Sequence, residues 1–284
     1  MAWTAFCFLV NVASVLITVN LPKEARDALE SLQTDPSQTP DVDALMSALT
    51  VLSPILAFGL AVQCVMAAAV YRIILTPADG KFSYLRLGKD ELRLMALTLI
   101  YVVLGVMFLA VAQLAIGIVA FVASVFGQTA FAFVLSVSEL FMLGLFFYIL
   151  VRMSLAPVIT FDKGRLAILD SWEVTKGQFW RLLGAYMLAI CCVVVVSILA
   201  LTLFFMLAGV VVLLTGGSLA ELSQIFRPDE TKLSTYLNPF MIAYMVVGSV
   251  FTAVYYAVIA APGAWAYREL TGKGELAPVP AADI

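Results

Sequence analysis

The sequence predicts an all-α integral membrane protein, a six-transmembrane helical bundle with interfacial amphipathic helices. Of its 284 residues, 63% are hydrophobic and only 12% are charged, and the mean hydropathy is +1.04. A soluble domain carries about 25% charged residues. With about half the usual fraction of charged residues, this chain has too few of them to cover a water-facing surface, so lipid must solvate much of it. We expect one membrane domain over residues 1–284.

Six apolar stretches reach the roughly 20 residues that a helix needs to cross the hydrocarbon core. We expect spans at about 3–21, 45–75, 95–126, 129–151, 182–214 and 238–267. The third and fourth come from one apolar block, which would be roughly 85 Å long as a single helix. A turn at Gly127-Gln128 is expected to divide this block.

Basic residues predict the orientation of these spans. The first, third and fifth connections hold four of the 16 Lys and Arg residues: Lys23, Arg26, Arg227 and Lys232. The second and fourth connections and the C-terminal tail hold the other twelve. By the positive-inside rule, the basic set is cytoplasmic and both termini are inside. We expect a multi-pass protein of the bacterial inner (cytoplasmic) membrane.

The N-terminal region carries two further expectations. Residues 22–44 form an outer acidic segment, with a short helix from Pro22 to Gln33 that Asn20 caps. Met1 enters the first span without the basic flank of a cleavable signal peptide. Two interpretations stay open: the first helix is a signal-anchor, or the native N-terminus is longer.

The residue inventory argues against several kinds of chemistry. There is no histidine, which removes the commonest general base and zinc ligand. The four cysteines lie in apolar runs without metal-ligand spacing, and no HExxH, Gly-x-Ser-x-Gly or Walker motif occurs. The pI near 5.0 gives no indication of nucleic-acid binding. We therefore expect no catalytic residue, metal or cofactor, and a protein that is not an enzyme.

The even-numbered spans end in similar sequences. Arg72, Arg152 and Arg268 each follow an apolar helix, and Arg-x-x-Leu-x-Pro occurs after the second and fourth spans. The pattern suggests three related hairpins. The alternative is that membrane helices in general tend to end in arginine, which suits the helix dipole and lipid phosphates.

Two cytoplasmic elbows, 76–94 and 152–181, are neither apolar enough to span nor polar enough to be disordered. In the second, residues 161–181 are expected to form an interfacial helix, because Leu166, Leu169 and Trp172 have helical spacing and aromatic residues stand beside basic ones. The lipid- or partner-binding candidates are Arg72, Arg86, Arg152, Arg165, Trp172, Lys176, Trp180 and Arg181.

The segment Asp170-Ser171-Trp172-Glu173-Val174-Thr175-Lys176-Gly177, followed by Phe179-Trp180-Arg181-Leu182-Leu183, resembles the YciC-like inner-membrane proteins. It is also similar to the membrane domain of some glycerophosphodiester phosphodiesterases. The likeness extends over roughly 72–186 and includes Arg152-x-x-Leu155-x-Pro157 and Arg86-Leu87-Gly88-x-x-Glu91-Leu92. It implies a six-span bundle without an assigned activity.

Glu139 is the one carboxylate inside an expected span, close to its midpoint. A charge at that depth costs at least about 2.5–3.5 kcal/mol, and apart from Arg72 at the very end of the second span, no Lys, Arg or His lies in a span to pair with it. Hydrogen bonds from Gln113, Gln63, Asn11, Ser136 or Ser138 are candidates. Two roles stay open for Glu139, in proton or ion coupling and as a polar clasp between helices.

Together these features favour a non-enzymatic membrane scaffold or envelope factor that interacts with membrane lipids or with a membrane or cytoplasmic protein partner. The alternative is a small transporter or channel that uses Glu139. The substrate and the oligomeric state do not follow from the sequence.

Overall fold

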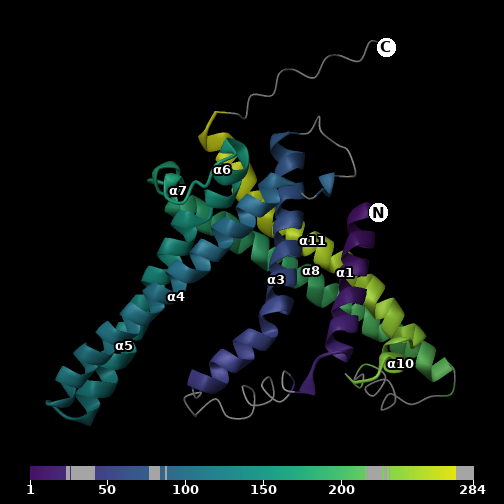
Figure 1. The fold of residues 1–284 in the computed structure, drawn as a ribbon, viewed down its shortest axis with the longest axis horizontal. Helices are drawn as coiled ribbons and strands as arrows, with labels where there is room; N and C mark the ends of the chain where they lie inside the picture. The colour runs from purple at the N-terminus through teal and green to yellow at the C-terminus, as the bar shows by residue number, and fades with distance from the viewer. Residues whose placement is uncertain are drawn as a thin grey trace. The chain divides into compact units, whose positions relative to one another are not determined.

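A computed structural model of the chain describes residues 1–23, 26, 42–76, 84–86, 88–214, 216, 226, 229 and 231–272. Within these ranges the regular structure is helical, as predicted (Figure 1). All of the expected acidic helix at Pro22–Gln33 except residues 22, 23 and 26 lies outside them, as do Arg227 and the tail beyond Gly272.

Six stretches among the described residues are long and apolar enough to cross a membrane, which confirms the predicted class. They comprise α1 (Ala2–Val19), α3 (Val42–Leu75), α4 (Lys89–Ser124), α5 (Gln128–Met153) continued by α6 (Ala156–Lys163), α8 (Phe179–Leu214) and α11 (Pro239–Leu270). Two shorter helices, α7 (Asp170–Val174) and α10 (Leu233–Tyr236), lie in the connections. Except at its two ends, a helix satisfies its backbone hydrogen bonds within itself, so apolar sequence in lipid adopts it.

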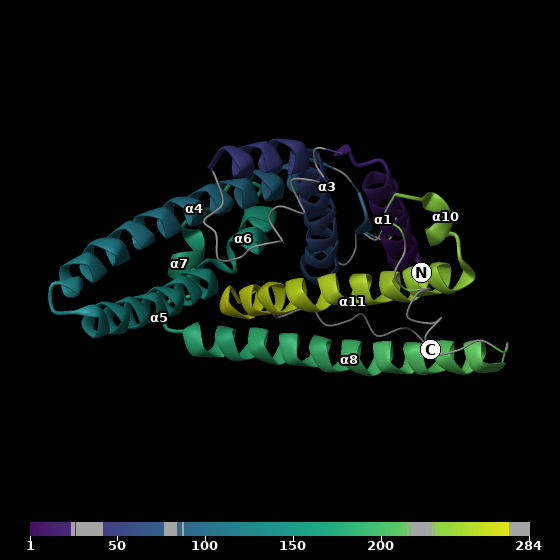
Figure 2. The same cartoon turned by 90° about the horizontal axis from the view of Figure 1, so that it is seen from below.

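The helices α4 and α5 form an antiparallel hairpin, and Figures 1 and 2 both show them side by side. The apolar block divides where the sequence predicts: α4 ends at Ser124, and Gly127 adopts a φ of 108°, which favours glycine. Phe108 and Phe146 stack across the hairpin with ring centroids 6.2 Å apart. This contact is part of the packing between the two helices.

The chain divides into two compact units, each with its own packing. The first comprises residues 1–67, 81–85 and 190–258. Its apolar core contains Cys7, Val62, Met66 and Ala253, and Asn11 donates a hydrogen bond of 2.9 Å from Nδ2 to Ser249 Oγ. This bond between α1 and α11 gives Asn11 a partner other than Glu139.

The second unit comprises residues 68–80, 86–189 and 259–284. It contains the α4–α5 hairpin, α6 and α7, the C-terminal ends of α3 and α11, and the N-terminal end of α8. Leu97, Leu155, Ala156 and Ile159 are fully buried in it. The unit therefore brings together the helix ends at which the sequence places its basic residues.

Candidate functional site

The ends of α3, α5 and α11 each carry one arginine, and all three arginines are buried. Arg72, Arg152 and Arg268 are 1%, 5% and 8% exposed. Each guanidinium lies against an aromatic ring: Phe161 at 5.6 Å, Trp172 at 4.5 Å and Trp265 at 4.9 Å, respectively. We call this region of the second unit the basic end. The three positions thus share an environment as well as a sequence pattern.

Arg72 is neutralised within the protein by Glu91. Its Nη2 donates to Glu91 Oε1, and the side chain of Glu91 is only 2% exposed. The second oxygen of Glu91 accepts from the backbone N–H of Gly88 at 2.8 Å, which caps the start of α4. This buried pair joins the end of α3 to the start of α4. Arg72 therefore serves the packing of these two helix ends.

The end of α5 is held by two hydroxyl groups from the segment around α7. Ser171 Oγ and Thr175 Oγ1 both donate to the backbone carbonyl of Arg152, at 2.7 and 3.1 Å, and both residues are fully buried. Trp172 lies between them in the sequence and covers the Arg152 guanidinium. The DSWEVT sequence therefore satisfies an orphan carbonyl at a helix end and places an aromatic face on the charge.

The guanidinium of Arg152 has no acidic partner among the described residues. None of the ion pairs that the structure describes involves it, and its Nε is buried without a hydrogen bond. Its contact is the ring of Trp172, which is itself 39% exposed. Arg72 and Arg152 therefore occupy similar positions, but only Arg72 is neutralised by a described carboxylate.

The structure divides the interfacial helix that the sequence predicts within 161–181. Here α6 ends at Lys163, Gly164 adopts the left-handed conformation with φ 60°, and α7 covers only Asp170–Val174. A second glycine, Gly177, has φ 77° just before α8 begins. Because positive φ values end a right-handed helix, the elbow is two short helices joined by turns.

An ion cluster closes the turn between α6 and α7. Lys163 Nζ and Arg165 Nη2 both donate to Asp170 Oδ2, at 2.8 and 2.6 Å. The hydrogen bond from Lys163 and the charges of both cations hold the pKa of Asp170 below its usual value. The carboxylate of Asp170 thus partly neutralises Arg165, a predicted headgroup contact.

We expect this cluster to make the turn sensitive to acid. A depressed pKa means that Asp170 stabilises the turn above the carboxyl's unfolded pKa of about 4, and that this contribution is lost as the pH falls through the lower folded value. Amide hydrogen exchange of residues 164–169, corrected for intrinsic rates, should show protection at neutral pH that disappears at strongly acidic pH. Asp170→Asn should lack that protection at both pH values. Equal protection of the wild type at neutral and acidic pH would show that the Asp170 carboxylate does not stabilise the turn.

The elbow exposes both basic and large apolar side chains. Trp180 is 78% exposed and Leu169 66% exposed. The exposed cations of this stretch are Lys163, Arg165, Lys176 and Arg181. From Lys163 to Arg181 there are four basic and two acidic residues, a net charge of +2. Exposed aromatic and basic groups beside a membrane helix are typical of the lipid headgroup layer.

The other predicted residues fall at separate places. Arg86 is exposed, shortly before α4 begins. Most of the first elbow, 76–94, precedes α4, but residues 89–94 are its first turns. Gln63 is exposed on the part of α3 that belongs to the first unit. The structure therefore brings together Arg152 and Trp172, with Trp180 and Arg181 nearby in the chain at the start of α8.

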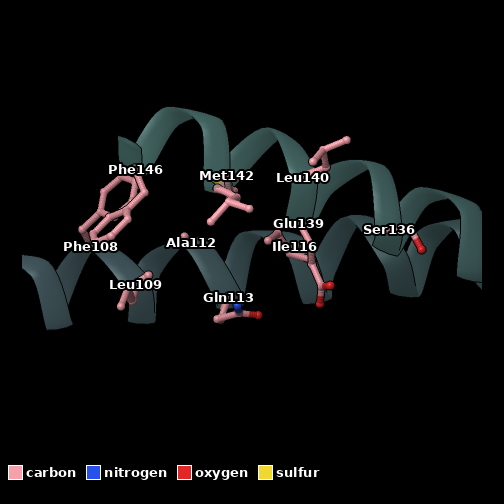
Figure 3. Close-up of a pocket in the computed structure, with 11 residues that line it drawn as sticks. Phe108, Leu109, Ala112, Gln113, Ile116, Ser136, Glu139, Leu140, Met142 and Phe146 are labelled. Carbon is pink, nitrogen blue, oxygen red and sulfur yellow. The ribbon is translucent and has the colours of Figure 1, made fainter. Parts of the chain in front are cut away.

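Glu139 lines a groove of about 570 Å³ along the α4–α5 hairpin. Gln113 and Ser136 line the same groove, and Figure 3 shows the Glu139 and Gln113 side chains directed to the same side of the hairpin. All three are exposed in the isolated chain. Of the expected partners, the structure thus groups Gln113 and Ser136 with Glu139.

Three contacts at the basic end were not anticipated. They are the Arg72–Glu91 pair, the Ser171 and Thr175 hydroxyl bonds, and a 2.7 Å hydrogen bond from Tyr267 Oη to Asp162 Oδ2. The one signal in the sequence was Gly88-x-x-Glu91. In this spacing, a glutamate at the third residue of a helix accepts a hydrogen bond from the backbone N–H of the residue that precedes the helix. The other contacts join residues far apart in the chain.

The described residues hold no group of three His, Cys, Asp or Glu side chains arranged to bind a metal. In comparisons with family models, curated proteins and solved structures, nothing matches the chain. The likeness to YciC-like proteins therefore remains a resemblance.

Proposed function

We propose that this protein is a non-enzymatic membrane scaffold whose basic end binds anionic lipid headgroups, with Arg152 receiving the headgroup phosphate. The observation that carries the proposal is the buried Arg152 guanidinium, which has no acidic partner among the described residues. The proposal concerns the protein's own lipid environment and involves no reaction.

The contact with the Trp172 ring does not offset the desolvation free energy of the buried Arg152 charge. Removing a charged group from water costs several kcal/mol. A cation–π contact such as that with Trp172, at 4.5 Å, returns about 0.5–2 kcal/mol. The difference favours an anion beside the guanidinium. At the end of a membrane helix, the most abundant anion is a lipid phosphate, which accepts the paired N–H groups of arginine well.

The surroundings of Arg152 support a headgroup over a soluble anion. Trp172 and Trp180 expose apolar rings with polar N–H groups, which suit the headgroup layer. Lys176 and Arg181 are exposed on the same elbow and add long-range attraction to an anionic surface. Under this proposal the basic end faces the cytoplasm, as the distribution of Lys and Arg predicts.

Arg152→Gln is expected to reduce the preference of the full-length protein for phosphatidylglycerol over phosphatidylcholine by about tenfold. That factor corresponds to the loss of one hydrogen-bonded charge contact. Native mass spectrometry of the detergent-solubilised protein, titrated with each lipid, measures the two affinities. Arg152→Lys should remain impaired, because an ammonium lacks the planar fork of a guanidinium.

Lys176→Gln provides the control, since it removes the same charge from an exposed position on the same elbow. It should change the preference far less than Arg152→Gln. Millimolar inorganic phosphate should not displace the lipid; displacement would indicate a site for free phosphate. An unchanged preference in Arg152→Gln, or equal losses in both variants, would rule out a specific site and leave only diffuse surface charge.

The transporter alternative depends on Glu139. A coupling carboxylate normally faces a water-filled path inside a membrane protein. In the isolated chain Glu139 instead lines an open groove on the α4–α5 hairpin. This position favours a role of Glu139 in association between chains over transport by a single chain.

A further inference from the structure

The α4–α5 hairpin exposes polar side chains at a depth where lipid tails provide no hydrogen-bond partner. Glu139 lies 11 residues after the start of α5, and Gln113 lies 11 residues before the end of α4. At 1.5 Å per residue, both lie roughly 17 Å from the same end of the hairpin, near the middle of the bilayer. The two polar groups therefore share one depth and one groove.

The hairpin does not satisfy the Glu139 carboxyl by itself. No Lys, Arg or His occurs between Arg93 and Arg152. The structure shows no hydrogen bond to Glu139 from a described residue, although Gln113 and Ser136 line the same groove. Lipid tails contain no donors or acceptors, so an exposed carboxyl at this depth requires a polar partner outside the hairpin.

We propose that the groove is occupied by the α4–α5 hairpin of a second copy of this chain. The reason is complementarity: Gln113 supplies two amide donors and a carbonyl, and Glu139 supplies a carboxyl. In a two-fold dimer, Glu139 of each copy meets Gln113 of the other, so one contact forms twice. Hydrogen bonds of this kind hold membrane helices together.

The walls of the groove suit the same occupant. Phe108, Leu109, Leu140 and Leu143 line it beside the polar groups, and Leu140 is 71% exposed. Van der Waals packing of these large apolar side chains against a facing helix surrounds the polar centre and excludes lipid from the hydrogen bonds. The inference is independent of the headgroup proposal, because it concerns the hairpin and not the basic end.

Dilution of the full-length protein in phosphatidylcholine vesicles, followed by single-molecule photobleaching, measures its self-association. We expect the wild type to form dimers and Glu139→Leu to weaken them about tenfold, the effect of losing two interhelical hydrogen bonds. Gln113→Leu should have the same effect, and the double variant should be no weaker than either single variant, because the two residues share one contact. Glu139→Gln should still dimerise, since an amide retains the hydrogen bond.

Two matched controls locate the interface. Gln63→Leu makes the same exposed polar-to-apolar change on α3 and should leave dimerisation unchanged. A photo-crosslinking residue at Leu140 should give crosslinked dimers, whereas one at Leu56, 58% exposed on α3, should give none. The Glu139→Gln result separates this effect from misfolding, because that variant keeps both shape and hydrogen bonding.

Two results would overturn the dimer. One is a wild type that stays monomeric at every protein-to-lipid ratio. The other is Glu139→Leu that associates as strongly as the wild type. A monomeric wild type whose Glu139→Gln variant loses a proton-dependent flux would instead assign Glu139 to coupling. A Leu140 crosslink to a different protein alone would assign the groove to another partner.

Discussion

Replacing Glu91 by alanine is expected to destabilise the protein by about 3–5 kcal/mol, the usual effect of removing one partner of a buried ion pair. Arg72 is 1% exposed and would be left charged without its carboxylate. The substitution also removes the acceptor for the Gly88 N–H at the start of α4. Unfolding in mixed detergent micelles with increasing dodecyl sulfate measures the change.

Asp90→Ala supplies the comparison for this prediction. Asp90 is 4.0 Å from Arg72 and 2.9 Å from Arg93, but its side chain is 36% exposed. Pairs at that exposure contribute about 0–1 kcal/mol, so Asp90→Ala should have a small effect. The double variant Arg72→Met/Glu91→Leu should recover much of the stability lost in Glu91→Ala, because it buries no charge. A Glu91→Ala variant as stable as Asp90→Ala would contradict a structural role for the pair.

The six spans were predictable because lipid leaves the chain few choices. An apolar stretch of about 20 residues must be helical in a bilayer. The hairpin turn was also predictable, since the apolar block was too long for one span and Gly127 accepts a positive φ. The structure begins α4 at Lys89 and ends α5 at Met153, a few residues beyond the expected spans.

The elbow was harder to predict, because the helical spacing of its apolar residues covers only a short part of the stretch. Leu166, Leu169 and Trp172 recur at helical intervals, yet Gly164 takes a left-handed conformation and Asp170 draws Lys163 and Arg165 into a turn. A pattern of three apolar residues cannot outweigh a glycine and an ion cluster within the same 20 residues. The left-handed conformation of Gly164 and the ion pairs of Asp170 together produce the turn between α6 and α7.

The burial of the arginines was the feature least accessible to sequence reasoning. In the sequence, Arg72 and Arg152 stand in similar Arg-x-x-Leu-x-Pro motifs, and both were expected to face lipid headgroups. Their difference depends on residues 19 and 20 positions away, Glu91 in one case and Trp172 in the other. The position of Gln113 in the same groove as Glu139 was easier to predict, because residues equally far from a hairpin turn lie at the same depth.

Gly263 marks a close approach of α11 to α8 within the second unit, and we expect Gly263→Val to destabilise the protein by about 1–3 kcal/mol. A Cβ at this position would lie 2.8 Å from Tyr186 Oη and 3.8 Å from Leu155 Cδ2. The Tyr186 hydroxyl, on α8, is the atom nearest to the added Cβ, so a larger side chain at position 263 must displace the tyrosine ring.

Two comparisons test whether this clash is the cause. Gly248→Ala, also on α11, should be neutral or stabilising by up to about 1 kcal/mol, because no atom lies within 4 Å of the added Cβ and alanine favours helix. Gly263→Ala alone should destabilise, and Tyr186→Phe should suppress that loss in the double variant, since it removes the clashing oxygen. Unfolding in the same detergent mixture measures all five variants, Gly263→Val included. Additive effects of Gly263→Ala and Tyr186→Phe would show that the two residues do not meet, and would place the close approach elsewhere.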